Sequence, residues 1–244
     1  MKVLGVIPSR YGSVRLPGKP LVDLEGKSMI QRVWEQASKA KCLDDLVVAT
    51  DDVRILKKVK SFGGRAVLTS RRHPSGTDRI AEAVKGSRYE TIVNIQGDEP
   101  LLPPSLIEQA VAALAYDSNA VMGTLRKRFA DSKEAQSPQV VKVVVDKNNN
   151  ALYFSRSLIP YPRTGSPVFY KHIGIYAYRR EFLNTYSKLR PTPLEKFEGL
   201  EQLRVLEHGF KIKAFETRLD SISVDTSEDA EKVKELIRKS SKKE

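Results

Sequence analysis

The sequence contains little cysteine and little histidine. Cys42 is the only cysteine among 244 residues, so no disulfide bond can form within the chain. One cysteine and three histidines also fail to give the ligand spacing of a zinc site. Because such sparse cysteine is typical of proteins from a reducing compartment, we expect a cytoplasmic protein.

Long apolar runs are absent as well. No run approaches the roughly 18 residues that a membrane-spanning helix needs. The first apolar run is interrupted at Pro8, which makes it too short for the core of a signal peptide. The pattern G-x-S-x-G, which marks a nucleophilic serine in many hydrolases, is also missing. We therefore expect no membrane partner and no covalent catalytic triad.

Negative charge is scarce relative to positive charge. The chain has 42 Lys and Arg against 30 Asp and Glu, which gives a net charge of +12. The basic residues are spread over predicted helices beside acidic ones rather than gathered in a stripe with aromatic residues, which argues against a nucleic-acid partner. The densest basic run lies in the tail 239–244, which we expect to be disordered. The positive charge favours capture of an anionic small molecule.

Short apolar runs alternate with amphipathic stretches up to about residue 145. This alternation predicts an α/β fold with a mostly parallel sheet that is covered by helices on both faces. The predicted strands are 3–7, 46–49, 66–68, 91–95, 120–124 and 140–145, and the clearest helical spacing covers residues 29–37 and 106–114.

The alternation of short apolar runs with amphipathic stretches ends near Lys147. A turn signal at 148–150 is followed by a long irregular segment that is rich in proline. We interpret residues 147–195 as a smaller lobe, inserted in a single domain 1–244, that returns through a strand at 173–178. A helix is predicted over 197–207, and a last helix begins near Thr226.

The most informative segment is the loop after the first predicted strand, within residues 7–20. It carries Arg10, Arg15 and Lys19 among small residues whose backbone N–H groups are accessible. It is not a Walker loop, because five residues rather than four separate its two glycines and proline follows the lysine; the dinucleotide pattern G-x-G-x-x-G is absent. Loops at the carboxyl ends of such strands bind ligands, and these cations suit a triphosphate.

Further motifs extend a likeness to a known family along the chain. In order they are Ser75–Arg79, Asn94–Pro100, Ala151–Arg156, His172–Tyr176, Leu200–Arg204 and Val224–Thr226. Together with the loop at 7–20, these segments resemble sugar nucleotidyltransferases of the CMP-sugar type, and most of all the 3-deoxy-manno-octulosonate (Kdo) cytidylyltransferase family. The resemblance implies a Rossmann-like sheet of the nucleotide-diphospho-sugar transferase type. It also implies a homodimer in which the inserted lobe forms much of the interface.

The resemblance implies the reaction of CTP with Kdo to give CMP-Kdo and diphosphate, for lipopolysaccharide biosynthesis. Attack of the anomeric hydroxyl on the α-phosphorus calls for alignment, charge neutralisation and Mg²⁺ as cofactor. Asp98 follows the predicted strand 91–95, at a position where a carboxylate can hold Mg²⁺. Asp225 resembles the second metal carboxylate of the family, although its position suits a helix cap equally well.

The remaining predicted site residues bind the nucleotide or the sugar, and Arg10 and Lys19 join the two aspartates as catalytic residues. Those predicted for the nucleotide are Ser9, Arg10, Gly12, Ser13, Arg15, Lys19, Ser75, Gly76, Thr77 and Arg79. Those predicted for the acidic sugar are Gln96, Arg156, His172, Tyr176, Glu201 and Gln202, with Arg156 as the counter-ion of the sugar carboxylate. Ser75 could instead cap a helix, and His172 could be structural.

A few residues depart from the pattern of the family and leave alternatives open. They are Pro74, Asp78, Ser223 and Ser227, and none is a predicted cation or metal ligand. The segments 75–79 and 170–172 resemble a branch that activates 8-amino-Kdo, so that sugar or another acidic sugar is an alternative substrate. A non-enzymatic basic binding protein with the same fold is the remaining alternative.

Overall fold

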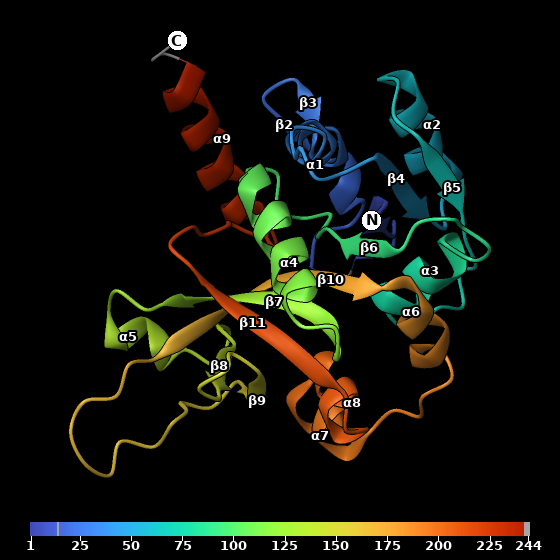
Figure 1. The fold of residues 1–244 in the computed structure, drawn as a ribbon. Coiled ribbons are helices and arrows are strands. Elements are labelled where there is room, and N and C mark those ends of the chain that lie inside the picture. The colour runs from blue at the N-terminus through green and yellow to red at the C-terminus, as the bar shows by residue number, and fades with distance from the viewer. Residues whose placement is uncertain (14, 242–244) are drawn as a thin grey trace.

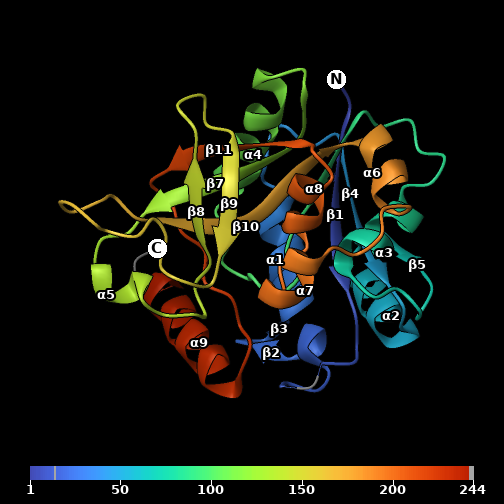
Figure 2. The ribbon, with the colours of Figure 1, turned by 90° about the horizontal axis from the view of Figure 1, so that it is seen from below.

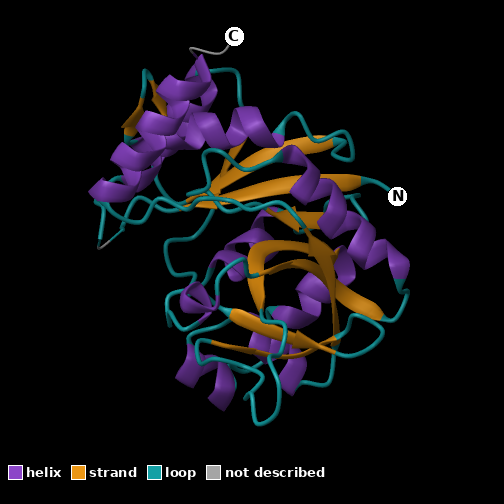
Figure 3. Ribbon diagram, turned by 90° about the vertical axis from the view of Figure 1, so that its left-hand side faces the viewer, coloured by secondary structure: helices purple, strands orange, loops and turns teal. Residues whose placement is uncertain are grey.

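A central sheet with helices on both faces forms the body of the protein (Figure 1, Figure 3). The structure, a computed structural model, describes residues 1–13 and 15–241. The strands of the central path lie in the order β11-β7-β10-β6-β1-β4-β5. Their bounds are β1 (Val3–Ser9), β4 (Asp45–Thr50), β5 (Ala66–Leu68), β6 (Thr91–Asn94), β7 (Ala120–Arg128), β10 (Tyr170–Arg179) and β11 (Lys211–Thr217). The predicted α/β fold with a mostly parallel sheet is confirmed.

The first strand explains why the sequence begins with an unbroken apolar run. β1 lies between β4 and β6 and is parallel to both. Its alternate side chains enter two different cores: Val3 and Ile7 pack on one face of the sheet, and Leu4 and Val6 on the other. A strand buried on both faces needs apolar residues at every position rather than at every second one.

The helices divide between the two faces of the sheet (Figure 2). One core holds residues of α1 (Met29–Ala37), α2 (Val53–Ser61) and α4 (Pro104–Tyr116). The other holds residues of α3 (Gly76–Ala83), α6 (Arg180–Tyr186) and α8 (Gln202–Glu207). α9 (Ser227–Ser241) packs separately, against the small hairpin of β2 (Asp23–Leu24) and β3 (Lys27–Ser28). The remaining helices are the 3₁₀ helix η1 (Lys19–Leu21), α5 (Ser132–Ala135) and α7 (Pro193–Glu198).

The segment 147–195, predicted as an inserted lobe, contributes to the central sheet itself. Its strand β10 runs antiparallel between β6 and β7. A hairpin of β8 (Lys142–Val145) and β9 (Ala151–Ser155) pairs with β10 at one point and extends the sheet sideways. The loop between β9 and β10 projects from the body of the molecule (Figure 1). The expected return strand at 173–178 lies within β10, and the proline-rich composition belongs to the loop between β9 and β10.

Two predictions near the C-terminus differ from the structure. The helix predicted over 197–207 is two short helices, α7 and α8, because Gly199 adopts a left-handed conformation with φ of 63° and ends α7. The tail predicted to be disordered is helical over 239–241, where α9 continues, and 242–244 lie outside the described residues. Among the described residues, no helix is long and apolar enough to cross a membrane.

Candidate active site

Two neighbouring strands bring the predicted motifs to one edge of the sheet. The loop with Arg10 follows β1, and the segment 96–100 follows β6. Because β1 and β6 are parallel neighbours, both segments leave the same edge. They also approach each other closely, since a Cβ atom at Gly97 would lie 3.0 Å from the carbonyl oxygen of Pro8. A larger residue at position 97 would therefore crowd the contact between the two loops.

The two aspartates predicted to bind a metal lie together. The Nζ atom of Lys19 donates to Asp98 Oδ2 at 2.6 Å and to Asp225 Oδ1 at 2.9 Å. Arg15 contacts the same oxygen of Asp225 at 2.9 Å. A backbone hydrogen bond from Val224 N to Asp98 O, 2.8 Å long, joins the two segments directly. The fold therefore builds a carboxylate pair from residues far apart in the sequence.

The start of α9 shows that the helix is not capped by the carboxylate of Asp225. The cap is formed by Thr226, whose hydroxyl accepts from Asp229 N, and by Asp229, whose Oδ2 accepts from the backbone N–H groups of Asp225 and Thr226. The carboxylate of Asp225 is therefore not used as the cap and faces Lys19. The described residues contain no group of three or more His, Cys, Asp or Glu side chains that could hold a metal. A pair of carboxylates is nevertheless what Mg²⁺ needs when water and substrate phosphates complete its ligands.

A cavity of about 310 Å³, here called the loop cavity, opens over the carboxylate pair. The predicted residues that line it are Ser9, Arg10, Ser13, Arg15, Lys19, Gln96, Asp98 and Asp225. Gly12, also predicted to bind the nucleotide, does not line it. The loop is fastened by Arg54, whose guanidinium stacks 3.4 Å from the ring centroid of Tyr11. Three cations and two carboxylates thus share one small cavity.

A second cavity of about 220 Å³, the helix cavity, lies beside the N-terminus of α3 and also contacts Ser9, Arg10 and Gln96. Ser75, Gly76 and Arg79 line it, as predicted for nucleotide contacts. However, the hydroxyl of Ser75 caps α3 by accepting from Asp78 N at 3.1 Å. The guanidinium of Arg79 binds Asp51 Oδ2 at 2.8 Å and Thr69 Oγ1 at 2.6 Å, so it mainly supports the wall of the cavity.

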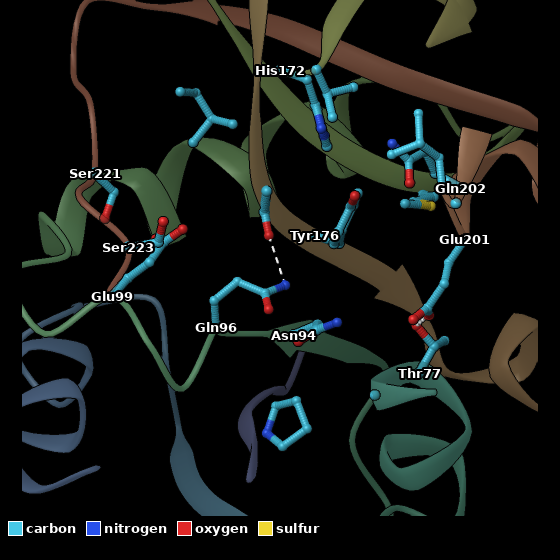
Figure 4. A pocket seen from close by; sticks show the side chains of 18 of the residues that line it. Thr77, Asn94, Gln96, Glu99, His172, Tyr176, Glu201, Gln202, Ser221 and Ser223 are labelled. Atoms are coloured by element: carbon cyan, nitrogen blue, oxygen red, sulfur yellow. Dashed lines mark hydrogen bonds between the residues drawn. The ribbon is translucent and has the colours of Figure 1, made fainter. Parts of the chain in front are cut away.

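The third and largest cavity, of about 480 Å³, is called the large cavity (Figure 4). The predicted sugar residues that line it are Gln96, His172, Tyr176, Glu201 and Gln202. Thr77, which was predicted to bind the nucleotide, also lines this cavity. Its hydroxyl donates to Glu201 Oε2 at 2.7 Å. Gln96 lines all three cavities and is fixed by a 2.9 Å hydrogen bond to Gly174 O. The three cavities therefore meet around one side chain.

Comparisons with known proteins identify the family of the chain. A family model described as cytidylyltransferase matches residues 4–215. The chain belongs to the cytidylyltransferase family. It is 51% identical over 240 residues to the 3-deoxy-manno-octulosonate cytidylyltransferase of Fusobacterium nucleatum, covering 98% of each chain. It is 47% identical over 249 residues to the enzyme of the same name from Geobacter metallireducens, covering 97% of this chain and 98% of that one.

Solved structures of cytidylyltransferases are similar to this structure over nearly the whole chain. One, described as CMP:2-keto-3-deoxy-manno-octonic acid synthetase complexed with CTP, matches with a TM-score of 0.94 and 43% identity. That match covers 98% of this chain and 100% of the other. A cytidylyltransferase from Leptospira borgpetersenii, with a TM-score of 0.65 and 19% identity over 98% of this chain and 87% of the other, shares the fold.

His172 is an uncharged side chain in the wall of this cytidylyltransferase's large cavity. Burial lowers the pKa of its imidazole to about 3. Its Nε2 atom lies 3.0 Å from the hydroxyl of Thr124, and its ring lies 5.4 Å from that of Tyr176, centroid to centroid. His172 and Tyr176 thus both face the large cavity from β10. A neutral imidazole there can exchange hydrogen bonds with a ligand without adding charge.

Arg156 does not line any of the three cavities, so the structure does not bring it together with the other residues predicted to bind the sugar. Its Nε donates to Glu198 O at 2.8 Å and its guanidinium reaches Pro138 O at 3.1 Å. Arg156 directly follows β9, and its side chain contacts the end of α7. Among the described residues, Lys171 is the only lysine or arginine that lines the large cavity, where it binds Asp220 at 2.9 Å. Sequence reasoning noted Lys171 only as part of a motif and passed over Asp220.

Three further polar groups of the large cavity are buried, and of these only Gln202 was predicted from the sequence. Burial, and then the nearby charge of Asp98, raises the pKa of Glu99 to about 7. The hydroxyl of Tyr186 and the Nε2 atom of Gln202 are buried without a hydrogen-bond partner in the described part of the chain. All three side chains line the large cavity. Buried polar atoms without partners are costly unless a ligand or water satisfies them, so they indicate a polar ligand.

Proposed function

We propose that the protein transfers the cytidylyl group of CTP to the anomeric hydroxyl of Kdo, giving CMP-Kdo and diphosphate. The observation that carries this proposal is the carboxylate pair at the junction of a cationic cavity and a larger polar one. Close relatives named Kdo cytidylyltransferase support the same reaction. The product then enters lipopolysaccharide assembly, and a single cysteine supports a cytoplasmic location.

The loop cavity is the proposed site of the triphosphate. Arg10 and the backbone of its loop neutralise the phosphate oxygens, and the helix cavity takes the nucleoside. Asp98 and Asp225 are the proposed holders of Mg²⁺, which supplies polarisation of the α-phosphoryl group when bound. With the sugar in the large cavity, its hydroxyl faces the α-phosphorus from the side opposite the leaving diphosphate. Such orientation alone supplies on the order of 7–11 kcal/mol of the barrier reduction.

The large cavity is the proposed site of the sugar acid. Lys171 takes the place given to Arg156 as counter-ion of the sugar carboxylate, because it is the lysine that lines this cavity. Gln96, Glu201 and Gln202 offer hydrogen bonds to the hydroxyl groups of the sugar. A site built to pair these hydroxyls rejects analogues that leave its buried polar groups unpaired.

We also propose that the protein is a homodimer. Leu152 on β9, and Tyr161 and Val168 on the projecting loop, expose 61%, 84% and 41% of their surface. Apolar side chains gathered on one projecting hairpin and loop are typical of a surface that pairs with another chain. Light scattering at micromolar concentration should give twice the chain mass of 27.4 kDa. A mass of one chain at that concentration contradicts the dimer.

The reaction is tested by diphosphate release from CTP and Mg²⁺, with Kdo and 8-amino-Kdo in parallel. We expect release that depends on Kdo and that collapses in the Asp98→Asn variant. Faster release with 8-amino-Kdo would transfer the assignment to that sugar. Folded protein that releases diphosphate with neither sugar would overturn the proposed function, and salt-sensitive binding of generic nucleic acid without turnover would favour a binding role.

A further inference from the structure

Lys19 occupies an unusual position for a lysine predicted to bind phosphate. Within the described part of the chain, its ammonium group donates to the carboxylates of Asp98 and Asp225 and to no main-chain oxygen. Its side chain is 14% exposed, whereas those of the aspartates are 28% and 33% exposed. Lys19 is therefore the most buried member of this charge cluster, and it lies between its two acidic partners.

The backbone of Lys19 is held firmly, so that its side chain is the part that can move. Gly18, with φ of 67°, and Pro20 fix the start of the 3₁₀ helix η1. The side chain lines the loop cavity together with Arg10 and Ser13, which places phosphate oxygens bound there within reach of the same ammonium. Lys19 thus has two sets of acceptors, the carboxylate pair and a bound triphosphate.

A divalent cation needs the same carboxylate oxygens that Lys19 contacts. Two carboxylates beside Lys19 and Arg15 form a cluster in which positive and negative charges balance. Adding a divalent cation to this cluster is unfavourable, because it repels the two nearby cations. A triphosphate changes this balance, since its negative charge attracts Lys19 and compensates the metal.

We propose that Lys19 competes with the divalent cation for the carboxylate pair, and that CTP decides the competition by drawing the ammonium to its phosphates. Lys19 is then a positioning residue that couples metal binding to nucleotide binding. This inference rests on the proposed function for the identity of the nucleotide. It goes beyond that function by predicting effects of opposite sign on the two ligands when one lysine is removed.

The test measures Mn²⁺ binding without nucleotide, by isothermal titration and by electron paramagnetic resonance of the free ion. We expect Lys19→Met to bind Mn²⁺ about tenfold more tightly than the wild type, because one competing charge is gone. Lys19→Gln, which keeps a donor but loses the charge, should behave alike and replaces Lys19→Met if that variant fails to fold. Lys27→Met is the matched control: it removes a lysine from an ion pair with Glu35, outside the three cavities, and should leave Mn²⁺ affinity unchanged.

The second measurement is CTP binding in the presence of EDTA. The same Lys19 variants should bind CTP about tenfold more weakly, so the two affinities change in opposite directions. Unchanged or weaker Mn²⁺ binding by folded Lys19 variants would overturn the competition. Failure of the proposed function has a different signature, because wild-type protein would then neither bind CTP nor release diphosphate, whatever the Mn²⁺ result.

Discussion

The loop cavity and the large cavity share Gln96 but are built in different ways. The loop cavity consists of ionic side chains on two loops that directly follow β1 and β6, and its charges are paired with one another. The large cavity is lined by aromatic and amide groups together with a few carboxylates and Lys171, and some of its buried polar atoms have no hydrogen-bond partner among the described residues. In the loop cavity, charged side chains can exchange partners when an anionic ligand binds. The large cavity can select a polar ligand through its hydrogen-bonding groups.

Removing one member of the carboxylate pair gives the largest expected effect. Asp225→Asn should lower kcat on the order of 10³-fold, because a lost metal ligand removes several kcal/mol of stabilisation from the transition state. The KM for the sugar should change little, since Asp225 does not line the large cavity. Asp229→Asn, which alters only the cap of α9, is the control and should keep kcat within about threefold. Equal losses in both variants would mean that Asp225 acts through the helix.

Substitutions in the large cavity should change the KM for the sugar rather than kcat. Lys171→Met should raise the KM for Kdo about 50-fold and leave that for CTP unchanged, because a hydrogen bond to a charged group is worth about 1.5–3 kcal/mol. Arg156→Met should alter stability but hold the KM for Kdo within about threefold, since the guanidinium of Arg156 donates to the main-chain oxygens of Glu198 and Pro138 and does not line the large cavity. The reverse ranking of the two variants would return the sugar carboxylate to Arg156.

The two regions also differ in how far the sequence predicts them. Asp98, Arg10 and Lys19 were predictable because a loop that follows a buried parallel strand must lie at the carboxyl edge of the sheet. The contacts of Lys19 with both aspartates could not be predicted. They depend on the segment before α9 bringing Asp225 next to Asp98 and Lys19. Asp225 needed the structure to separate it from a cap, which Thr226 and Asp229 provide.

Prediction was weaker for the large cavity because its wall comes from distant segments. β10 enters the sheet antiparallel between β6 and β7, although its surroundings in the sequence indicate a lobe. Arg156 comes directly after β9 and Lys171 is the second residue of β10, and composition does not tell which of them faces the cavity. Tyr186 ends α6 and belongs to the same core cluster as Tyr178 of β10, a proximity between separate segments that the sequence does not indicate.

The uncharged state of His172 gives a pH test of the large cavity. Its pKa is lowered by burial to about 3, below its ordinary value of 6.5, so the unfolded chain binds more protons between these values. The stability that it contributes is present above pH 6.5 and is lost as the pH falls toward 3. Between pH 6.5 and 5, the wild type should lose about 2 kcal/mol more unfolding free energy than His172→Asn.

Urea unfolding at several pH values measures this difference. Only the slope against pH is compared, because His172→Asn also changes the contact with Thr124. His208→Asn serves as a control for the loss of one histidine, at a site partly exposed at the end of α8. Parallel slopes for the wild type and His172→Asn would show that the imidazole gains a proton inside the folded protein, and the cavity would then be more polar than its lining indicates.

The smallest effect tests the wall of the helix cavity. Ser75→Ala should lower the unfolding free energy by about 1 kcal/mol, because α3 loses its cap, while the KM for CTP stays within about twofold. Ser75→Asp keeps a cap and should restore stability, but it adds a negative charge beside the proposed nucleotide. If Ser75→Ala raises the KM for CTP tenfold at unchanged stability, the hydroxyl binds the nucleotide directly. The expected result instead means that the hydroxyl of Ser75 stabilises α3. The nucleoside is then recognised by other groups that α3 holds in position and not by the Ser75 hydroxyl.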